Sequence, residues 1–509
     1  MLLCENQTVL LGPPGCGKTT TIMNKIEEDV KKCPPEHIAL VSFTKKAVGE
    51  AVQRVSDRFG LARQRLPLFQ TIHALCYRQL GCQKSDLMTR QNYGELGHIL
   101  GYPLEATINM EEGALVLLDQ DKGSKMLFVD NMARIMRRPL KDVWREASID
   151  VMWAELERFS KTYSEYKRQT GKMDFTDILD RYIADGKPVE AEIAYIDEAQ
   201  DLSRIQWEVL QKCFSQAKKV VIAGDDDQSI FKWSGADLSS FLNLKGEKTV
   251  LAHSYRLPVA VFNKAAAIVG RVKQRFDKPF TPAAHTGKVG YVSSLDSVKI
   301  DPEVKTLILV RNVYLLKDVY EFLKLRGFNF TGRGDHKSVD PDHVRAISTW
   351  ESVRKGEAVP LDNVRNMYEF LRVGSILSRG GKAALAAVDE KENEYFTWET
   401  LRDHYGLLDK PIWHKALLGI PLEKREYYIS MLRRKQRLSA PANVHVNTIH
   451  GVKGGEADHV IILSDMSRKT YEEMQKDPCS EHRCAYVAVT RSKNLLTIVM
   501  PQGKYSYAY

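Results

Sequence analysis

The sequence near the amino end combines a strand, a glycine-rich turn and a helix in a fixed order. Thr8–Leu11 is a short β-prone run, Gly12–Thr19 (GPPGCGKT) matches the pattern GxxxxGK[ST], and helix-forming residues continue through Lys32. In this context the backbone N–H groups of the turn and the amino end of the helix bind phosphate. A chance glycine turn is the alternative, and the flanking strand and helix argue against it. The order predicts a parallel sheet with helical crossovers.

This turn assigns roles to its side chains. Lys18 is expected to reach the β- and γ-phosphates of ATP, and Thr19 is expected to ligate Mg²⁺. ATP and Mg²⁺ are therefore the predicted substrate and cofactor. The predicted nucleotide-binding residues of the turn are Gly12, Pro13, Pro14, Gly15, Cys16, Gly17, Lys18, Thr19 and Thr20.

Two further apolar runs end in polar residues. Ile193–Ile196 is followed by Asp197 and Glu198, and Val220–Ala223 leads to Gln228. Asp197 is expected to hold the metal, and Glu198 is expected to act as general base for the attacking water. Gln228 is placed to sense the γ-phosphate or to orient that water. An acidic strand end without function is the alternative interpretation of Asp197 and Glu198.

The length of 509 residues exceeds what one hydrophobic core supports, so several domains are expected. Short apolar runs alternate with longer amphipathic stretches, which is typical of parallel α/β sheets. The first group of expected strands is Thr8–Leu11, Ile38–Phe43, Leu68–Ile72, Ile193–Ile196 and Val220–Ala223. The second group is Thr249–Ala252, Thr306–Val310, Val444–Thr448, Val460–Ser464 and Leu495–Val499.

Two long stretches interrupt the strand rhythm and are expected to be helical. One runs from about Cys76 to Thr170, and the other runs from about Asp335 to Ala440. Insertions at the ends of strands leave the core of an α/β domain intact. The sequence therefore predicts two α/β domains, each with a largely helical insertion.

The composition narrows the class of protein. The net charge of +9 suits a nucleic-acid partner, although a solvated basic surface would give the same value. No apolar run reaches the ~20 residues that span a bilayer, and the phosphate loop begins almost at once, so neither a membrane protein nor a secreted one is expected. A cytoplasmic protein, or one in a nucleus or organelle, is the expectation. The eight cysteines lack paired metal-site spacing and are expected to be reduced, including those of the segment Cys479–Cys484.

Several segments together resemble the superfamily-one helicases, and within them the UvrD/Rep branch. The segments that carry the resemblance, in the family's order along the chain, are Phe43–Ala47 (FTKKA), Thr71–His73 (TIH), Ile196–Asp201 (IDEAQD), Gly224–Ile230 (GDDDQSI), Ser254–Arg256 (SYR), Thr448–Glu456 (TIHGVKGGE) and Tyr486–Arg491 (YVAVTR). The resemblance covers the chain apart from its two helical insertions.

The resemblance implies two RecA-like P-loop NTPase domains that bind ATP between them and single-stranded DNA across their tops. The first domain would comprise 1–75 and 171–247 with the insertion 76–170, and the second would comprise 248–334 and 441–509 with the insertion 335–440. Arg256 and Arg491 are implied to lie on the second domain and to contact the γ-phosphate. Arginines in that role contribute ~10³–10⁵ in rate, whereas the alternative for each is a surface salt bridge. Glu456 is implied to contact the ribose.

Single strands are held by basic grooves and by aromatic side chains on which bases stack. The family pattern implies DNA contacts by Phe43, Thr44, His73, Phe175, Phe231, Trp233, Thr448 and His450. Core packing is the alternative for each aromatic residue, and for Phe175 it is as well supported as a DNA contact. Trp233 is the strongest candidate, because it follows Gln228 closely in a polar, glycine-containing loop.

The sequence departs from the family pattern in three places. Relatives carry a glutamine-containing adenine-binding segment before the phosphate loop, but only eleven residues precede Gly12 here, and Gln7 stands too close to serve. Ser234 follows Trp233 where relatives commonly have arginine. The second insertion is also shorter than in the large bacterial members. The compact chain is consistent with a phage or viral source.

The leading hypothesis is a DNA-dependent ATPase that moves 3′-to-5′ along single-stranded DNA and separates duplex strands in replication, repair or recombination. It would act as a monomer on single strands and on junctions with duplex. One rival is a translocase that strips proteins without unwinding. Another is an ATP-switched scaffold that recruits replication or recombination proteins.

Overall fold

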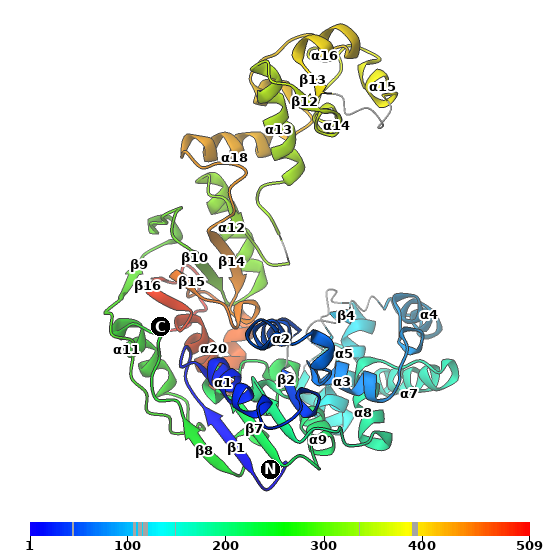
Figure 1. The fold of residues 1–509 in the computed structure, drawn as a ribbon, viewed down its shortest axis with the longest axis vertical. Helices are drawn as coiled ribbons and strands as arrows, with labels where there is room; N and C mark the ends of the chain where they lie inside the picture. Colours follow the sequence, from blue (N-terminus) through cyan, green and yellow to red (C-terminus); the bar gives the residue numbers. More distant parts are fainter. Residues whose placement is uncertain are drawn as a thin grey trace. The chain divides into compact units, whose positions relative to one another are not determined.

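The computed structural model describes residues 1–42, 45–104, 108–109, 114–115, 121–147, 149–334, 336–388 and 395–509. The chain forms two compact units, which Figure 1 draws along the colour ramp of the sequence. Unit 1 comprises Met1–Thr286 and Glu473–Thr490, and unit 2 comprises Gly287–Glu472 and Arg491–Tyr509. The chain therefore passes from one unit to the other after Thr286, after Glu472 and after Thr490.

Unit 1 is built on a six-stranded sheet with the order β3-β2-β6-β7-β1-β8, in which all neighbours are parallel. Its strands are β1 (Gln7–Leu11), β2 (Ile38–Ser42), β3 (Phe69–Thr71), β6 (Ile193–Ile196), β7 (Lys219–Gly224) and β8 (Glu247–Val250). Leu11 pairs with Gly224, and Ile196 pairs with Ile222. The loops after β1, β6 and β7 consequently leave the sheet at the same edge.

Helices cover both faces of this sheet, as side chains that alternate along a strand point to opposite sides. Leu10, Leu40 and Val221 pack on one face against α1 (Lys18–Val30) and α2 (Lys45–Phe59). Val9, Val41 and Ile222 pack on the other face, against α3 (Ile72–Gln79), α8 (Phe175–Asp185) and α9 (Arg204–Cys213). Unit 1 also contains α10 (Leu238–Leu242), α11 (Val259–Val269) and α20 (Pro478–Val489), and α20 packs on α11.

The first insertion has a hydrophobic core of its own. It consists of α4 (Arg90–Leu100), the short strands β4 (Ile108–Asn109) and β5 (Ala114–Leu115), α5 (Lys122–Ile135), α6 (Leu140–Ala147) and α7 (Trp153–Thr170). Its buried core runs from Met88 to Tyr166. Cys76, by contrast, lies within α3 and belongs to the core under the sheet. The insertion is helical, as the sequence predicts, but α3 continues across the expected start of the insertion.

Unit 2 is built on a second six-stranded parallel sheet, with the order β11-β14-β10-β15-β16-β9. Its strands are β9 (Lys288–Val292), β10 (Thr306–Val310), β11 (Phe330–Thr331), β14 (Val444–Thr448), β15 (Ala457–Leu463) and β16 (Ser492–Val499). Val319 and Leu323 of α12 (Leu316–Leu325) pack against Ile308 and Val446 on one face. Helix α19 (Arg468–Lys476) contains the second passage between units.

The second insertion also encloses its own core, which runs from Val339 to Met431. Its elements are α13 (Pro341–Arg354), β12 (Val359–Pro360), α14 (Leu361–Glu369), α15 (Gly381–Ala386), β13 (Tyr395–Phe396), α16 (Trp398–Tyr405), α17 (Trp413–Ala416) and α18 (Leu422–Arg433). Trp350, Trp398 and Trp413 are buried in it. A separate core is the property expected of an independent structural module.

One strand prediction is wrong in its grouping. The run Thr249–Ala252 is assigned by the sequence to the second group, whereas the structure places β8 at the edge of the first sheet, beside β1. The sequence also misses β9, because this edge strand is half-exposed and contains Gly290 instead of a continuous apolar run. Among the helices that the structure describes, none combines the length and apolar character needed to cross a bilayer.

Candidate nucleotide-binding and catalytic site

The phosphate loop lies between β1 and α1, as the sequence predicts. Gly15 and Gly17 have φ angles of 73° and 82°, a left-handed conformation that glycine adopts without steric cost. A Cβ atom on Gly15 would lie 2.3 Å from Cβ of Arg256, and one on Gly12 would lie 2.3 Å from Sγ of Cys16. Gly15 is therefore required by its φ angle and by the close approach of Arg256, and Gly12 is required by the close approach of Cys16. The buried Cys16 fills space inside the loop.

Lys18 and Thr19 occupy the first turn of α1. The buried Lys18 ammonium donates hydrogen bonds to the carbonyl oxygens of Gly12, at 2.7 Å, and Pro13, at 3.4 Å. The exposed Thr19 hydroxyl donates to Oδ2 of Asp197, at 3.4 Å. A hydroxyl and a carboxylate are hard oxygen ligands of the type that Mg²⁺ prefers. The residues present therefore fit a magnesium-bound triphosphate, with Thr20 exposed beside them.

Asp197 and Glu198 follow β6 at the same edge of the sheet. The Asp197 carboxylate accepts a hydrogen bond from the Glu198 N–H at 2.9 Å, and Glu198 has a φ of 53°. Burial, followed by the nearby Glu198 charge, raises the pKa of Asp197 to about 6. Such a carboxylate is ready for a cation to offset its charge.

Gln200 connects the two acidic strand ends, a role that the sequence does not assign to it. Its amide nitrogen donates to Oε2 of Glu198 at 2.5 Å, and its amide oxygen accepts the N–H of Asp225 at 2.9 Å. The buried Gln228 donates to Oδ2 of Asp225 at 2.7 Å. Gln200 lies inside the segment IDEAQD, but no spacing rule distinguishes it there from an ordinary polar residue.

Arg256 lies in unit 1, beside the phosphate loop. Ser254 donates from its hydroxyl to the carbonyl of Pro14 at 2.7 Å, and the Tyr255 N–H donates to the carbonyl of Gly15 at 2.9 Å. These bonds hold the half-buried Arg256 next to the loop. The family resemblance implies the second domain for this arginine. The structure includes Arg256 in unit 1. Arg256 follows shortly after β8, and β8 pairs with β1 of the first sheet.

Arg491 and Glu456 lie together in unit 2. The Arg491 side chain, only 1% exposed, donates from Nη1 to the carbonyl of Gly455 at 3.3 Å. Glu456 forms an ion pair with Lys493. The structure thus brings together two residues that the sequence predicts separately, one for the γ-phosphate and one for the ribose.

Phe231 and Trp233 form an aromatic pair on a short turn after Gln228. Their ring centroids lie 6.2 Å apart, and Trp233 is 48% exposed. Ser234 donates from its hydroxyl to the carbonyl of Phe231 at 2.9 Å, so it stabilises this turn. Lys232 forms an ion pair with Asp477 at 2.7 Å. An exposed indole on a fixed turn is suited to stacking against a base.

His73 and Phe175 also lie side by side, with ring centroids 5.9 Å apart. Burial lowers the pKa of His73 to about 4, so its ring is neutral at physiological pH and offers a DNA strand no charge. Phe175 packs partly against the core under the sheet. The position agrees with the core alternative that the sequence leaves open for Phe175, and it leaves an edge of the pair at the surface.

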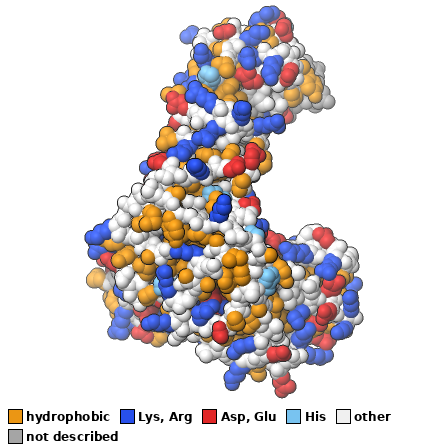
Figure 2. Space-filling view, turned by 90° about the vertical axis from the view of Figure 1, so that its left-hand side faces the viewer, with side chains coloured by type: hydrophobic (Ala, Val, Ile, Leu, Met, Phe, Trp, Pro, Cys, Tyr) orange, Lys and Arg blue, Asp and Glu red, His pale blue; other side chains and the backbone are white. Residues whose placement is uncertain are grey.

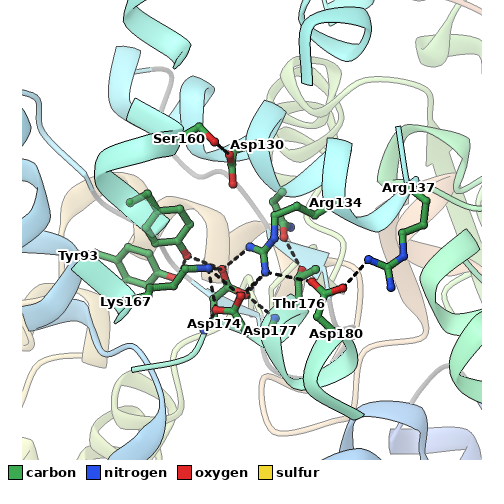
Figure 3. Close-up of polar contacts among 12 residues, drawn as sticks. Tyr93, Asp130, Arg134, Arg137, Ser160, Lys167, Asp174, Thr176, Asp177 and Asp180 are labelled. Atoms are coloured by element: carbon green, nitrogen blue, oxygen red, sulfur yellow. Dashed lines mark hydrogen bonds and ion pairs between the residues drawn. The ribbon is translucent and has the colours of Figure 1, made fainter. Parts of the chain in front are cut away.

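The segment before Phe175 is fixed by a buried ionic cluster (Figure 3). Asp174 accepts from Arg134 at 2.6 Å, from Lys167 at 2.8 Å and from the Tyr163 hydroxyl at 2.7 Å. Asp177 accepts from Arg134 at 2.5 Å and from Lys167 at 2.9 Å. Burial would raise the pKa of Asp174, but the two cations outweigh it and hold that pKa well below its ordinary value. The cluster joins α5 and α7 of the first insertion to the start of α8.

Of the remaining residues predicted to contact DNA, the structure describes two and leaves two outside the described residues. Thr448 ends β14 and accepts the Gly451 N–H at 3.1 Å, and His450 is half-buried on the turn that follows. Phe43 and Thr44 lie outside the described residues. Lys and Arg side chains are interspersed with Asp and Glu over the face drawn in Figure 2. Charge on that face therefore does not by itself mark a path for DNA.

Gln7 and the cysteines have structural roles. The Gln7 side chain accepts the Leu3 N–H at 2.7 Å and donates to the carbonyl of Lys245 at 2.5 Å, so its amide holds the segment before β1 to the chain before β8. All eight cysteines are free. Among the described residues, the group of three or more potential metal ligands is Asp225, Asp226 and Asp227, and the segment Cys479–Cys484 forms none.

Two family models match the chain. The model of the UvrD/REP helicase N-terminal domain matches residues 1–249, which end in β8, and the model of the UvrD-like helicase C-terminal domain matches residues 443–499. The individual relatives share low sequence identity with this chain. The chain is 27% identical over 310 residues to the putative ATP-dependent DNA helicase YjcD of Bacillus subtilis, a match that covers 55% of this chain and 38% of the relative.

Two further relatives show the same relation. The chain is 24% identical over 331 residues to the ATP-dependent DNA helicase Rep of Buchnera aphidicola, which covers 60% of this chain and 47% of Rep. It is 23% identical over 314 residues to the ATP-dependent DNA helicase PcrA of Staphylococcus aureus, which covers 57% of this chain and 42% of PcrA. The matched region thus spans less than half the length of each of these relatives.

Proposed function

The chain belongs to the UvrD/REP helicase family, and on this premise we propose that it is a DNA-dependent ATPase that moves 3′-to-5′ along single-stranded DNA and separates duplex strands. One observation carries the ATPase part of the proposal, and the direction of movement and strand separation rest on the resemblance to the family. The Thr19 hydroxyl lies 3.4 Å from the Asp197 carboxylate, at the edge of the sheet where Lys18, Glu198 and Gln228 also gather. This is the residue set that phosphoryl transfer from ATP to water requires.

The chemistry assigns a task to each of these residues. Lys18 would exchange its two carbonyl partners for the β- and γ-phosphates. Thr19 and Asp197 would hold Mg²⁺, which when bound would supply positive charge that offsets the charge of the phosphates. Glu198 takes a proton from the attacking water, and Gln228 senses the γ-phosphate. Arg256 and Arg491 stabilise the charge that develops on the transferred phosphoryl group.

Movement follows from the change in that charge. The γ-phosphate attracts the guanidinium groups of Arg256 and Arg491, and hydrolysis removes it. The state with the γ-phosphate and the state without it therefore differ in their contacts with these guanidinium groups, as a two-state mechanism requires. The strand is gripped alternately by Phe43, Thr44 and Trp233 of the first domain and by Thr448 and His450 of the second. His73, Phe175 and Phe231 complete the path, and Glu456 contacts the ribose.

The same proposal extends to organisation and setting. We assign two RecA-like domains, one on each six-stranded sheet, and two helical insertions, one between α3 and α8 and one between β11 and β14. The first domain continues past residue 247, because β8 pairs with β1. The separate cores of the two insertions support this division. The protein works as a monomer at junctions of single- and double-stranded DNA, in the cytoplasm of a bacterium or of a phage-infected host, or in a nucleus or organelle. Its pathway is replication, repair or recombination.

The test is strand separation of duplexes with a 3′ or a 5′ single-stranded tail, with ATP and Mg²⁺. We expect unwinding of the 3′-tailed duplex, and none with Glu198→Gln, which should still bind ATP and DNA. Displacement of streptavidin from biotinylated single strands without unwinding would establish the protein-stripping alternative. Binding of DNA controlled by ATP, with no displacement and no unwinding, would establish the scaffold.

A further inference from the structure

Three consecutive carboxylates are buried where β7 ends, and one lysine contacts all of them. Lys278 lies 2.8 Å from Oδ1 of Asp225 and 3.0 Å from Oδ2 of Asp227, and it also forms an ion pair with Asp226. Arg275 donates two hydrogen bonds to Asp227, at 2.8 and 2.7 Å. Exposure is 3% or less for Lys278 and for each of the three aspartates. We call this group the Lys278 cluster.

The protein supplies the cation of this cluster. One oxygen from each aspartate lies within 4.8 Å of the others, a spacing that suits a bound ion. The Lys278 ammonium occupies that position, and its three N–H donors match the three carboxylates one for one. Burial raises the pKa of a carboxyl group, yet the pKa of Asp225 is lowered because the Lys278 charge outweighs its burial.

Asp225 connects the Lys278 cluster to the proposed catalytic groups by hydrogen bonds. Oδ2 of Asp225 accepts the Gln228 amide at 2.7 Å, and the Asp225 N–H donates to Gln200, whose amide donates to Glu198. Asp225 thus contacts Lys278 on one side. On the other side it contacts Gln228, the proposed γ-phosphate sensor, and Gln200, which binds the proposed general base Glu198. A shift of Asp225 displaces both, and misplacement of about 1 Å can cost ~10² in rate.

The cluster is also tied to the segments that lead into unit 2. Lys278 lies between α11 and the passage after Thr286. Arg483 of α20 donates to the carbonyl of Asp226 at 2.8 Å and to that of Gln274 at 2.6 Å. Helix α20 ends just before the passage after Thr490, which Arg491 follows. The contacts of the cluster therefore join the loops of the nucleotide site to two of the connecting segments.

We infer that Lys278 is a positioning residue for ATP turnover, which fixes Gln228 and Glu198 through Asp225 and links them to the segments that connect the units. The inference rests on the proposed ATPase function. It differs from a purely structural role because it predicts a loss of turnover in a folded protein that still binds ATP.

The test uses a charge-balanced double variant, Lys278→Met with Asp226→Asn, in the full chain with single-stranded DNA. We expect kcat to fall by about 10²-fold while KM for ATP and the affinity for a fluorescent ATP analogue stay within about threefold. Lys278→Arg keeps the charge and should recover kcat to within about tenfold of the wild type. Where the double variant does not fold, Lys278→Gln takes its place, with the same expected fall in kcat.

A matched control removes another ion pair from the same cluster. Arg275→Met removes two hydrogen bonds to Asp227 and leaves the partners of Lys278 and Asp225 in place, so kcat should stay within about threefold of the wild type. A folded Lys278 variant with wild-type kcat, or an equal loss in the control, would overturn the inference while leaving the proposed function standing. Absence of ATP turnover in the wild type would instead overturn the proposed function, and the inference with it.

Discussion

At the scale of single residues, the fold keeps a buried histidine neutral in the second sheet. His459 on β15 is 4% exposed, and its Nε2 lies 2.9 Å from the hydroxyl of Thr497 on β16. Burial lowers the pKa of His459 to about 4. The unfolded chain, with an ordinary histidine pKa near 6.5, therefore takes up a proton before the folded chain does.

This difference predicts a dependence of stability on pH. The contribution of His459 to the free energy of unfolding is fully present above about pH 6.5 and is lost as the pH falls towards 4, by about 2 kcal/mol at pH 5. Urea unfolding at pH 7 and pH 5 measures it. His459→Gln should flatten the dependence, whereas His98→Gln, at an exposed position of α4, should leave it as in the wild type. Equal slopes for the wild type and His459→Gln would refute the assignment.

Trp233 gives a second prediction at this scale. Its exposed indole contributes little to the core, so Trp233→Ala should leave the unfolding midpoint nearly unchanged. The loss of one base-stacking contact should weaken binding of a labelled single-stranded oligonucleotide by about 1–3 kcal/mol, measured by fluorescence anisotropy. Trp233→Phe should retain part of that affinity. Tyr291→Ala, at another exposed aromatic position, serves as the control. Unchanged affinity in Trp233→Ala would exclude it from the DNA path.

The site shows which residue positions a sequence can predict. The sequence places Lys18, Thr19 and Asp197 together because the phosphate loop and Asp197 follow strands whose ends can be recognised, and parallel strands bring their ends to one edge. Gln200 and Lys278 are missed because their partners are set by side-chain packing across the chain, for which no spacing pattern exists.

At the scale of elements, central strands are predicted well and edge strands poorly. β6 and β10 have the predicted bounds, because their side chains are largely buried and their sequences are correspondingly apolar. β14 also has the predicted bounds, although its side chains alternate between buried and half-buried. β8 is exposed along most of its length, so its sequence does not reveal which sheet it joins. Its pairing with β1 is a tertiary choice, and this choice determines where Ser254 and Arg256 meet the phosphate loop.

The ionic cluster at the start of α8 gives the prediction for this scale. Asp174→Ala removes the helix cap and leaves Arg134 and Lys167 with one fewer buried partner. Breaking a buried ion pair by removing one member costs about 3–5 kcal/mol. Glu165→Ala removes an exposed pair with Arg168 on α7 and should leave the unfolding midpoint nearly unchanged. Equal unfolding midpoints for the two variants in urea would contradict the role given to the cluster.

At the scale of the whole molecule, the sequence predicts two sheets and two helical insertions, and the structure contains them. The sequence predicts less well where one unit ends and the next begins. Helix α20 and the segment around Arg256 belong with unit 1, although they follow or precede strands of the second sheet. Such an exchange of segments depends on buried contacts, including those of Arg483, that a linear pattern does not display.

The central claim is that hydrolysis at the phosphate loop depends on DNA and on the Arg491 guanidinium. Steady-state ATP hydrolysis by the full chain, with and without a single-stranded oligonucleotide, tests it most directly when Arg491→Ala is measured beside the wild type. We predict that the oligonucleotide stimulates the wild type and that Arg491→Ala loses about 10³-fold or more of that turnover while still binding ATP. DNA-stimulated turnover that survives unchanged in Arg491→Ala would contradict the account.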